Sequence, residues 1–157
     1  MELNEMMKIV PLIDPADHGA GLLTPSGFNR ADAHHATIVL LWGAKAGSDA
    51  QFELEAGTAH DNYDDHVPFN AVRTNADFVA ENGDVLSHDH NLESGEDYFH
   101  SAADKRMTVI EIPAASLPAG KTWVRIKISA DADDQFVAAV AILQPRYAPL
   151  ETAVQTA

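Results

Sequence analysis

The feature that most constrains the fold is a set of short apolar segments with the two-residue period of β-strands. The clearest is Thr122–Ser129, in which Val124, Ile126 and Ile128 alternate with polar or charged neighbours. This pattern places one row of side chains in a core and the other row in solvent. Helical periodicity is scarce along the chain, so the sequence predicts an all-β protein.

Three further segments upstream predict strands. Ala36–Trp42 is a continuous run of aliphatic and β-branched residues, which predicts a central strand covered on both faces. Phe52–Glu55 alternates between apolar and acidic residues, and Arg106–Ile112 is a β-rich run that ends at Pro113. Because each segment is short and bounded by turn-forming residues, these segments favour several strands in one sheet system.

A last apolar segment, Phe136–Leu143, lies close to the C-terminus. The acidic turn Asp131–Asp134 separates it from Thr122–Ser129. Its β-branched residues and the adjoining strand favour sheet over helix. We therefore expect the two segments to pair with each other as an antiparallel hairpin.

Both ends of the chain carry apolar runs interrupted by proline. The first is Ile9–Asp17, with Pro11 and Pro15, and the second is Val140–Pro149. Proline has no amide hydrogen to donate, so neither run can form a helix or an interior strand along its whole length. We expect extended terminal arms that lie against another surface.

The chain has 157 residues, which is enough for one domain with its own core. We predict a β-sandwich or jelly-roll-like core over residues 31–143, flanked by an N-terminal arm at 1–30 and a C-terminal arm at 144–157. Gly, Asn and Asp are frequent in residues 57–104. This acidic, loop-rich insertion is expected to supply long loops and edge strands.

Net charge and composition exclude several classes of function. The formal net charge is −14, and residues 46–104 contain fourteen Asp or Glu and one basic residue, Arg73. An acidic surface opposes binding to nucleic-acid phosphates, and no apolar run reaches the roughly 20 residues that a membrane span needs. There is no cysteine, so a thiol nucleophile or thiolate metal site is excluded. We expect neither nucleic acid nor a membrane as partner.

The residues most suited to bind a metal are His88, His90 and Glu93. On a strand the two histidines would point to the same side, and such pairs can bind zinc, iron or manganese. The segment from Gly83 resembles the first metal-binding motif of cupins, which are jelly-roll proteins, but its spacings are too short and Trp123 replaces the fourth ligand. We therefore predict no metal, no cofactor and no enzymatic activity. A cupin-like metal-binding protein is the alternative.

Segments in a fixed order along the chain provide a family resemblance. They are Ile9–Asp17, Thr37–Trp42 with the following Gly43–Gly47, Trp123–Ile126 and Ala138–Pro149. In this order they resemble a family of small structural proteins encoded among the head genes of tailed phages and prophages. The resemblance is concentrated at the two ends of the chain and does not extend to its acidic middle.

The resemblance implies a non-enzymatic virion protein, best described as a decoration (cement) protein on the outer surface of the phage head. Its implied partner is the major capsid protein, and its implied oligomer is a trimer. The alternative within the virion is a head–tail connector or tail accessory protein. We expect contacts with the capsid or with sister subunits through residues at the two ends. These are Ile9, Val10, Pro11, Leu12, Ile13, Pro15, Leu22, Leu23, Pro145, Arg146, Tyr147 and Pro149.

Overall fold

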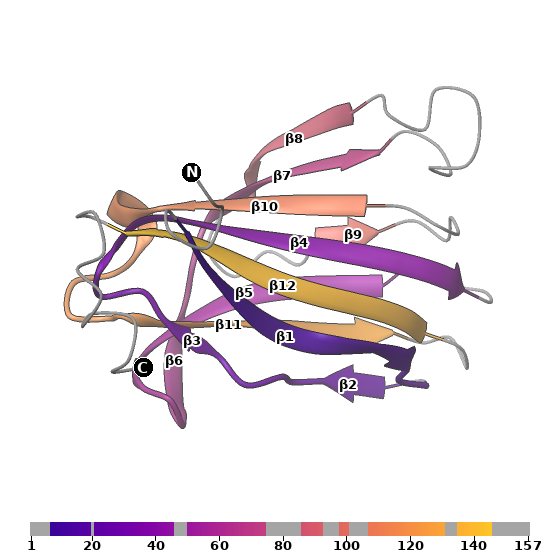
Figure 1. Ribbon diagram of the computed structural model, residues 1–157, viewed down its shortest axis with the longest axis horizontal. Coiled ribbons are helices and arrows are strands. Elements are labelled where there is room, and N and C mark those ends of the chain that lie inside the picture. The colour runs from indigo at the N-terminus through magenta and orange to yellow at the C-terminus, as the bar shows by residue number, and fades with distance from the viewer. Residues whose placement is uncertain are drawn as a thin grey trace.

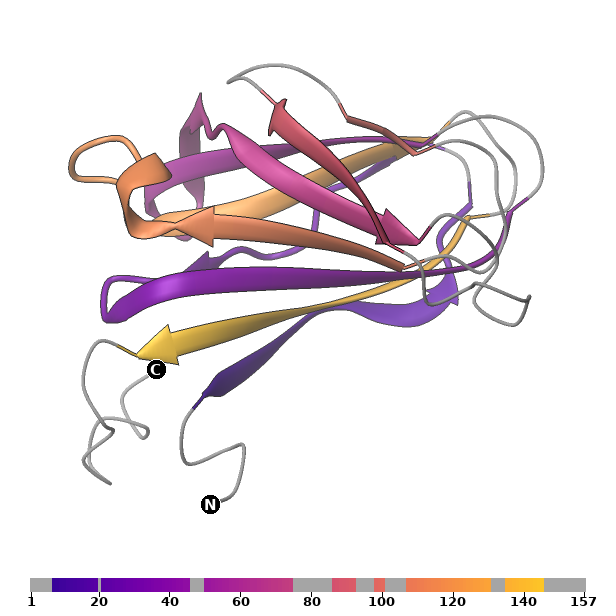
Figure 2. The ribbon, with the colours of Figure 1, turned by 90° about the horizontal axis from the view of Figure 1, so that it is seen from above.

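The chain folds into two antiparallel β-sheets that pack face to face (Figures 1 and 2). The computed structural model describes residues 7–19, 21–45, 50–74, 86–92, 98–100, 107–130 and 135–145. Within these ranges there is no α-helix and therefore none that could cross a membrane. The predicted all-β sandwich is confirmed.

Six strands form sheet A and six form sheet B. In spatial order, sheet A contains β1 (Lys8–Asp17), β12 (Gln135–Pro145), β4 (Ala33–Lys45), β10 (Met107–Pro113), β7 (Phe69–Thr74) and β8 (Leu86–Leu92). Sheet B contains β2 (Gly21–Leu23), β11 (Trp123–Ala130), β5 (Ala50–Ala59) and β6 (Asn62–His66), with β3 (Phe28–Asn29) paired to β11 and β9 (Tyr98–His100) paired to β5. The acidic region is expected to supply edge strands. Two of its strands, β8 in sheet A and β6 in sheet B, lie at sheet edges.

The core lies between the sheets and is built by alternation. In β11 the predicted inward row is fully buried, and β4, β10 and β12 each contribute a buried row from sheet A. Side chains such as Ile38, Ile110 and Ile126 are completely excluded from solvent. Burial of each one stabilises the fold by about 1.5–3 kcal/mol.

The hairpin predicted between Thr122–Ser129 and Phe136–Leu143 is wrong. Strand β11 pairs with β5 in sheet B, whereas β12 pairs with β4 and β1 in sheet A. The chain crosses from one sheet to the other between the two strands. The physical reason is burial, because in opposite sheets the inward row of β11 and the inward row of β12 cover each other across the core.

The prediction that Ala36–Trp42 is covered on both faces is also wrong. Strand β4 is central, since β12 and β10 bond to its two edges. Its inward residues, including Ile38 and Leu40, are buried, but Leu41 is 48% exposed. No further layer of described residues covers the outer side of sheet A, so the strand has one face in the core and one apolar face in solvent.

The described part of the predicted N-terminal arm, residues 1–30, contains three strands of the sandwich: β1 in sheet A and β2 and β3 in sheet B. Strand β1 occupies the edge of sheet A beside β12, and Ile13 anchors it in the core. The register shifts on either side of Ile13, near Pro11 and Pro15. Because proline cannot donate to the ladder, an edge position with irregular pairing is the one a strand of this sequence can occupy.

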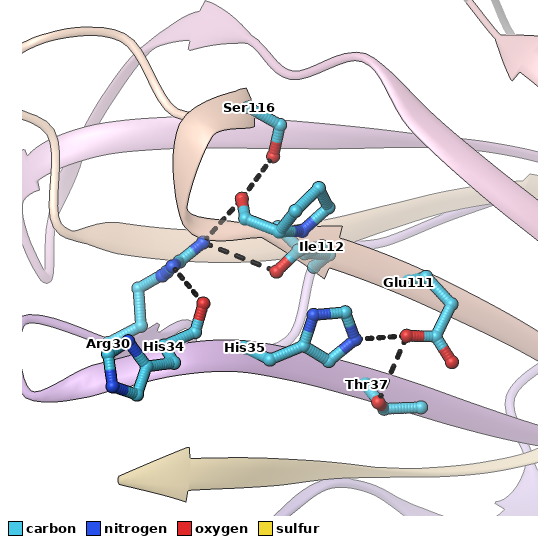
Figure 3. A network of polar contacts seen from close by, with 8 residues as sticks. Arg30, His34, His35, Thr37, Glu111, Ile112 and Ser116 are labelled. Carbon is cyan, nitrogen blue, oxygen red and sulfur yellow. Dashed lines mark hydrogen bonds and ion pairs between the residues drawn. The ribbon is translucent and has the colours of Figure 1, made fainter. Parts of the chain in front are cut away.

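A buried arginine fixes the end of β4 against the end of β10 (Figure 3). The Arg30 guanidinium donates to the carbonyl oxygen of Pro113 at 3.0 Å and to those of Ile112, Ala33 and His34 at 3.4 Å. The last two carbonyls lie in β4 and the others lie at the end of β10. This cluster helps to hold β4 and β10 in register, and that register sets which side chains lie side by side on the outer side of sheet A.

Candidate functional site

The outward-facing side chains of sheet A form apolar rows across neighbouring strands. In the central row, Val39 of β4 lies opposite Val140 of β12 on one side and Val109 of β10 on the other. Pro11 of β1 lies opposite Val140 and continues the row to the sheet edge. Directly opposed residues of antiparallel strands share a face, so this apolar row runs from β1 to β10.

Of the rows on either side, one is apolar across β12, β4 and β10, and the other is apolar on β1 and β12 and continues into Thr37 and Glu111. In one, Leu41 lies opposite Ala138 and Met107. In the other, Ile9 of the edge strand lies opposite Ile142. Ile9 and Leu41 are each 48% exposed although both are large and aliphatic. Contact with water along these rows is therefore extensive and costs free energy in the isolated chain.

Phe136, near the start of β12, lies at one end of this surface. Its side chain is 42% exposed and lies over Gly43 of β4. A Cβ atom added at Gly43 would be 2.9 Å from the Cβ of Phe136, so the glycine allows the aromatic residue to lie close against the sheet. We call this surface the apolar face. It comprises Ile9, Pro11, Val39, Leu41, Val109, Phe136, Val140 and Ile142.

A polar cluster of His35, Thr37 and Glu111 borders the apolar face on β4 and β10, and its members bond to one another (Figure 3). On β4, β10 and β12, Glu111 is the one charged side chain among the described outward-facing residues of the rows from Ile142 to Ala138. At the edge strand β1, Asp14 and Asp17 are exposed, and Asp17 lies opposite Phe136. The Glu111 carboxylate contacts Nε2 of His35, and the Thr37 hydroxyl donates to it at 3.5 Å. The carboxylate therefore needs no partner from outside.

The outer face of sheet B has the opposite chemistry. Arg125 Nε lies 2.5 Å from Glu55 Oε2, and Lys127 contacts Glu53 and, at 3.5 Å, Glu55. His66 Nδ1 lies 3.1 Å from the second oxygen of Glu53. We call these five residues the charged ladder. The hydrogen bond that Lys127 donates to the Glu53 carboxylate raises the pKa of Lys127, because it favours the protonated amine.

Tyr63 lies beside the charged ladder. The Arg125 guanidinium carbon is 4.3 Å from the centre of the Tyr63 ring, which is a cation–π geometry. Burial raises the pKa of Tyr63 above 10.0, and the positive charge of Arg125 opposes part of that increase. The outer face of sheet B thus satisfies its charges within the chain, whereas the apolar face leaves hydrophobic area uncovered.

The predicted contact residues of the N-terminal strands fall into two groups. Ile9 and Pro11 lie on the apolar face, and Pro15 of β1 is exposed. Leu22 of β2 is 62% exposed and lies on sheet B. The structure brings only part of the predicted set onto one surface.

The other predicted contact residues lie elsewhere. Ile13 is 5% exposed and belongs to the core, so it has no surface to offer a partner. Val10, Leu12 and Leu23 are partly buried and pack against the core. Pro145 ends β12 and is half-buried. The remaining members, Arg146, Tyr147 and Pro149, lie outside the described residues.

Sequence reasoning missed most of the apolar face, including Val39, Leu41, Val109 and Phe136. The signal was present in Thr37–Trp42 and Phe136–Leu143, which are apolar at every position or nearly so. A strand with one face in solvent ordinarily alternates between apolar and polar residues. A continuous apolar run in such a strand therefore indicates a second apolar surface.

The predicted metal ligands receive no support from the described part of the chain. The backbones of His88 and His90 lie in β8, but their side chains and Glu93 lie outside the description. Among the described residues there is no group of three histidine or acidic side chains arranged to hold a metal ion. The cupin-like alternative gains no observation in its favour.

The fold and its surfaces define a β-sandwich with one apolar and one charged outer face. Comparison with protein-family models, with curated proteins and with solved structures finds no match.

Proposed function

We propose that the chain is a non-enzymatic structural protein of a tailed-phage head, a decoration protein that binds the outer surface of the capsid. The observation that supports this proposal most directly is exposed apolar surface suited to assembly, both on the apolar face and at Leu22. Ile9, Leu41 and Phe136 expose large hydrophobic side chains on one face of an otherwise strongly acidic chain. Exposed patches of this kind mark protein–protein contacts. The resemblance at the two ends supports a phage head as the assembly concerned.

The physical mechanism of a decoration protein is stabilisation by binding. A protein that binds the assembled shell, and not its separated subunits, shifts the equilibrium toward the shell by mass action. The free energy gained grows with the concentration of free protein relative to its dissociation constant. The acidic surface keeps such a protein soluble at the high local density of a decorated head.

Pro15 and Leu22 are the predicted contact residues that lie outside the apolar face and remain exposed. They belong to β1 and β2, which follow one another along the chain. We propose that this N-terminal surface contacts the major capsid protein. Leu22 contributes most, because the greater part of its side chain is open to solvent.

Reconstitution on purified heads that lack this protein tests the proposal. The full chain is added, free protein is removed by sedimentation, and bound copies are counted by quantitative gel analysis. We expect saturable binding at hundreds of copies per head, with an increase in the temperature at which heads release DNA. Binding at about six or twelve copies would favour the connector alternative, since those numbers match ring symmetries. Absence of binding would overturn the proposal.

A pair of matched variants tests the N-terminal surface. Leu22→Asp places a charge where we propose an apolar contact and should weaken head binding about 10-fold or more. Thr24→Asp adds the same charge two residues away at another exposed position and should bind like the wild type. Equal binding by both variants would exclude Leu22 from the capsid contact.

A further inference from the structure

We infer that two copies of this chain form a twofold-symmetric dimer through the apolar face. We call this dimer interface the twofold joint. The inference rests on the proposed role of this face as a protein-contact surface and names its partner. Three properties of the face support it, namely the near absence of charge on β4, β10 and β12, its area and the position of the prolines in β1.

The near absence of charge limits what can cover the face. On β4, β10 and β12, Glu111 is the one charged residue among the described outward-facing rows, and it is bonded to His35 and Thr37. At the edge strand β1, Asp17 lies opposite Phe136 and accepts a hydrogen bond from the backbone amide of Gly19. A charged partner surface would lose its water here without gaining an opposite charge, which is costly. A suitable partner is apolar over a matching area. The same face of a second copy meets this condition, and the charged ladder of sheet B does not.

Net charge also favours this orientation. The chain carries −14, so two copies repel each other at most mutual orientations. When the apolar faces meet, the charged ladders lie on the far sides of the two sandwiches, separated by four sheets. Repulsion between the copies is therefore weakest in the arrangement that also buries the exposed side chains of Ile9, Leu41 and Phe136.

The area fits a reversible dimer. Four strands spaced by about 4.8 Å and rows spread over roughly six residues of about 3.4 Å give a face of ~400 Å². Two such faces bury ~800 Å², and a polar rim that includes His35 and Gln144 brings the total near the ~1,000 Å² expected of a specific contact. We therefore expect a dissociation constant in the micromolar range.

Prolines disfavour the competing edge-to-edge arrangement at β1. Pro11 and Pro15 remove amide donors from this edge strand, and its register is irregular around them. Another strand could not add a regular ladder there. Face-to-face packing needs no such ladder, and β-branched residues such as Val39 and Val140 suit the ~10 Å spacing of stacked sheets.

A self-complementary face gives a closed pair, because each copy presents the same residues to the other. The contact therefore predicts a dimer and differs from the trimer implied by the family resemblance. Its presence does not require a capsid. The joint can be measured on the free protein, while the capsid contact of the N-terminal surface is measured separately.

The first experiment measures the oligomeric state of the full chain without heads. Light scattering coupled to gel filtration and sedimentation equilibrium are carried out between about 1 and 200 µM, a range that brackets a micromolar dissociation constant. We expect a reversible monomer–dimer equilibrium. A monomer throughout this range, or a trimer, would overturn the twofold joint.

Three variants then locate the contact. Leu41→Asp and Ile9→Lys place charges of opposite sign on the apolar face, and both should raise the dissociation constant about 100-fold or more. Because the signs are opposite, a shared loss of dimer reflects lost apolar burial and not a change in net charge. Leu22→Asp is the control, since it removes an equally large exposed side chain from sheet B. It should leave the dimer intact, whereas dimers of all three variants would overturn the assignment.

The two proposals fail in different ways. Wild-type dimers that do not bind heads would overturn the decoration function and leave the joint in place. Wild-type monomers whose head binding is abolished by Leu41→Asp would show that the apolar face contacts the capsid, which overturns the joint and retains the decoration function. Circular dichroism and thermal melts of each variant establish that the fold is kept.

Discussion

The two outer faces of the sandwich are built on the same geometry and carry opposite chemistry. Val39 and Val140 are directly opposed across sheet A, as Lys127 and Glu53 are across sheet B. On their inner sides, both sheets contribute mostly aliphatic side chains to one shared core. The core thus constrains only every second position, and the other positions are free to suit either water or a partner.

The difference also shows what each face contributes to stability. Cross-strand pairs of either kind contribute roughly 0.2–1 kcal/mol each. Ion pairs of the charged ladder are complete within the chain, so they contribute to the monomer. The apolar face reaches its full contribution only when another surface removes it from water. One face supports the fold, and the other supports association.

Truncation of two neighbouring leucines should separate these roles most clearly. Leu40 is fully buried and Leu41 is 48% exposed on the opposite face of β4. Leu40→Ala should lower the free energy of unfolding by about 3 kcal/mol through lost burial and a cavity. Leu41→Ala should lower it by less than about 1 kcal/mol in the monomer and weaken the dimer.

Urea unfolding at low protein concentration and sedimentation equilibrium provide the two measurements for this pair. Association of folded Leu40→Ala should equal that of the wild type, because the outer face is unchanged. If Leu41→Ala cost as much stability as Leu40→Ala, the outer position would be part of the core and the contrast between the faces would fail.

Much of the fold could be predicted because alternation is a local property of the sequence. Val124, Ile126 and Ile128 alternate with charged or polar residues, and the inward row of β11 follows directly. Pro11 and Pro15 exclude an interior strand, and β1 is indeed an edge strand. Each of these conclusions depends on a few adjacent residues and needs no knowledge of the partners.

The pairing of strands and the apolar face could not be derived in the same way. Proximity along the chain favours a hairpin between β11 and β12, but burial of both apolar rows places them in different sheets. Leu41 and Phe136 look like core residues in sequence. They are exposed because sheet B covers only the inner side of sheet A. Which side is covered depends on strand pairings between distant parts of the chain, and the residues next to Leu41 and Phe136 do not reveal it.

A change in the charged ladder should have a smaller effect. Glu55 is 13% exposed and contacts both Arg125 and Lys127. Glu55→Gln should lower the free energy of unfolding by about 1 kcal/mol, because two cations lose a partly buried counter-charge. The dimer constant should not change, since the ladder lies on the far face.

Salt sharpens the same contrast. Between about 0.05 and 1 M NaCl, screening should reduce the difference in stability between the wild type and Glu55→Gln. Association through the apolar face should be unchanged or stronger, because salt also screens the repulsion between two acidic copies. Denaturant titrations and sedimentation at each salt concentration check both expectations. A dimer that dissociates at high salt would instead be held together by charges.

The smallest expected effect is a loss of stability at alkaline pH that originates in sheet B. The pKa of Lys127 is raised above 10.5 by its hydrogen bond to Glu53, and the pKa of Tyr63 is raised above 10.0 by burial. In this range the folded chain binds more protons than the unfolded chain, so the free energy of unfolding falls as pH rises. The contribution is complete below the unfolded pKa values and is lost as pH passes the folded ones. Urea titrations between about pH 9 and pH 11.5 should show this decline.

The decline should be shallower in Lys127→Arg, whose guanidinium stays charged. Equal declines in the two proteins would assign the alkaline sensitivity to other groups and separate it from the charged ladder.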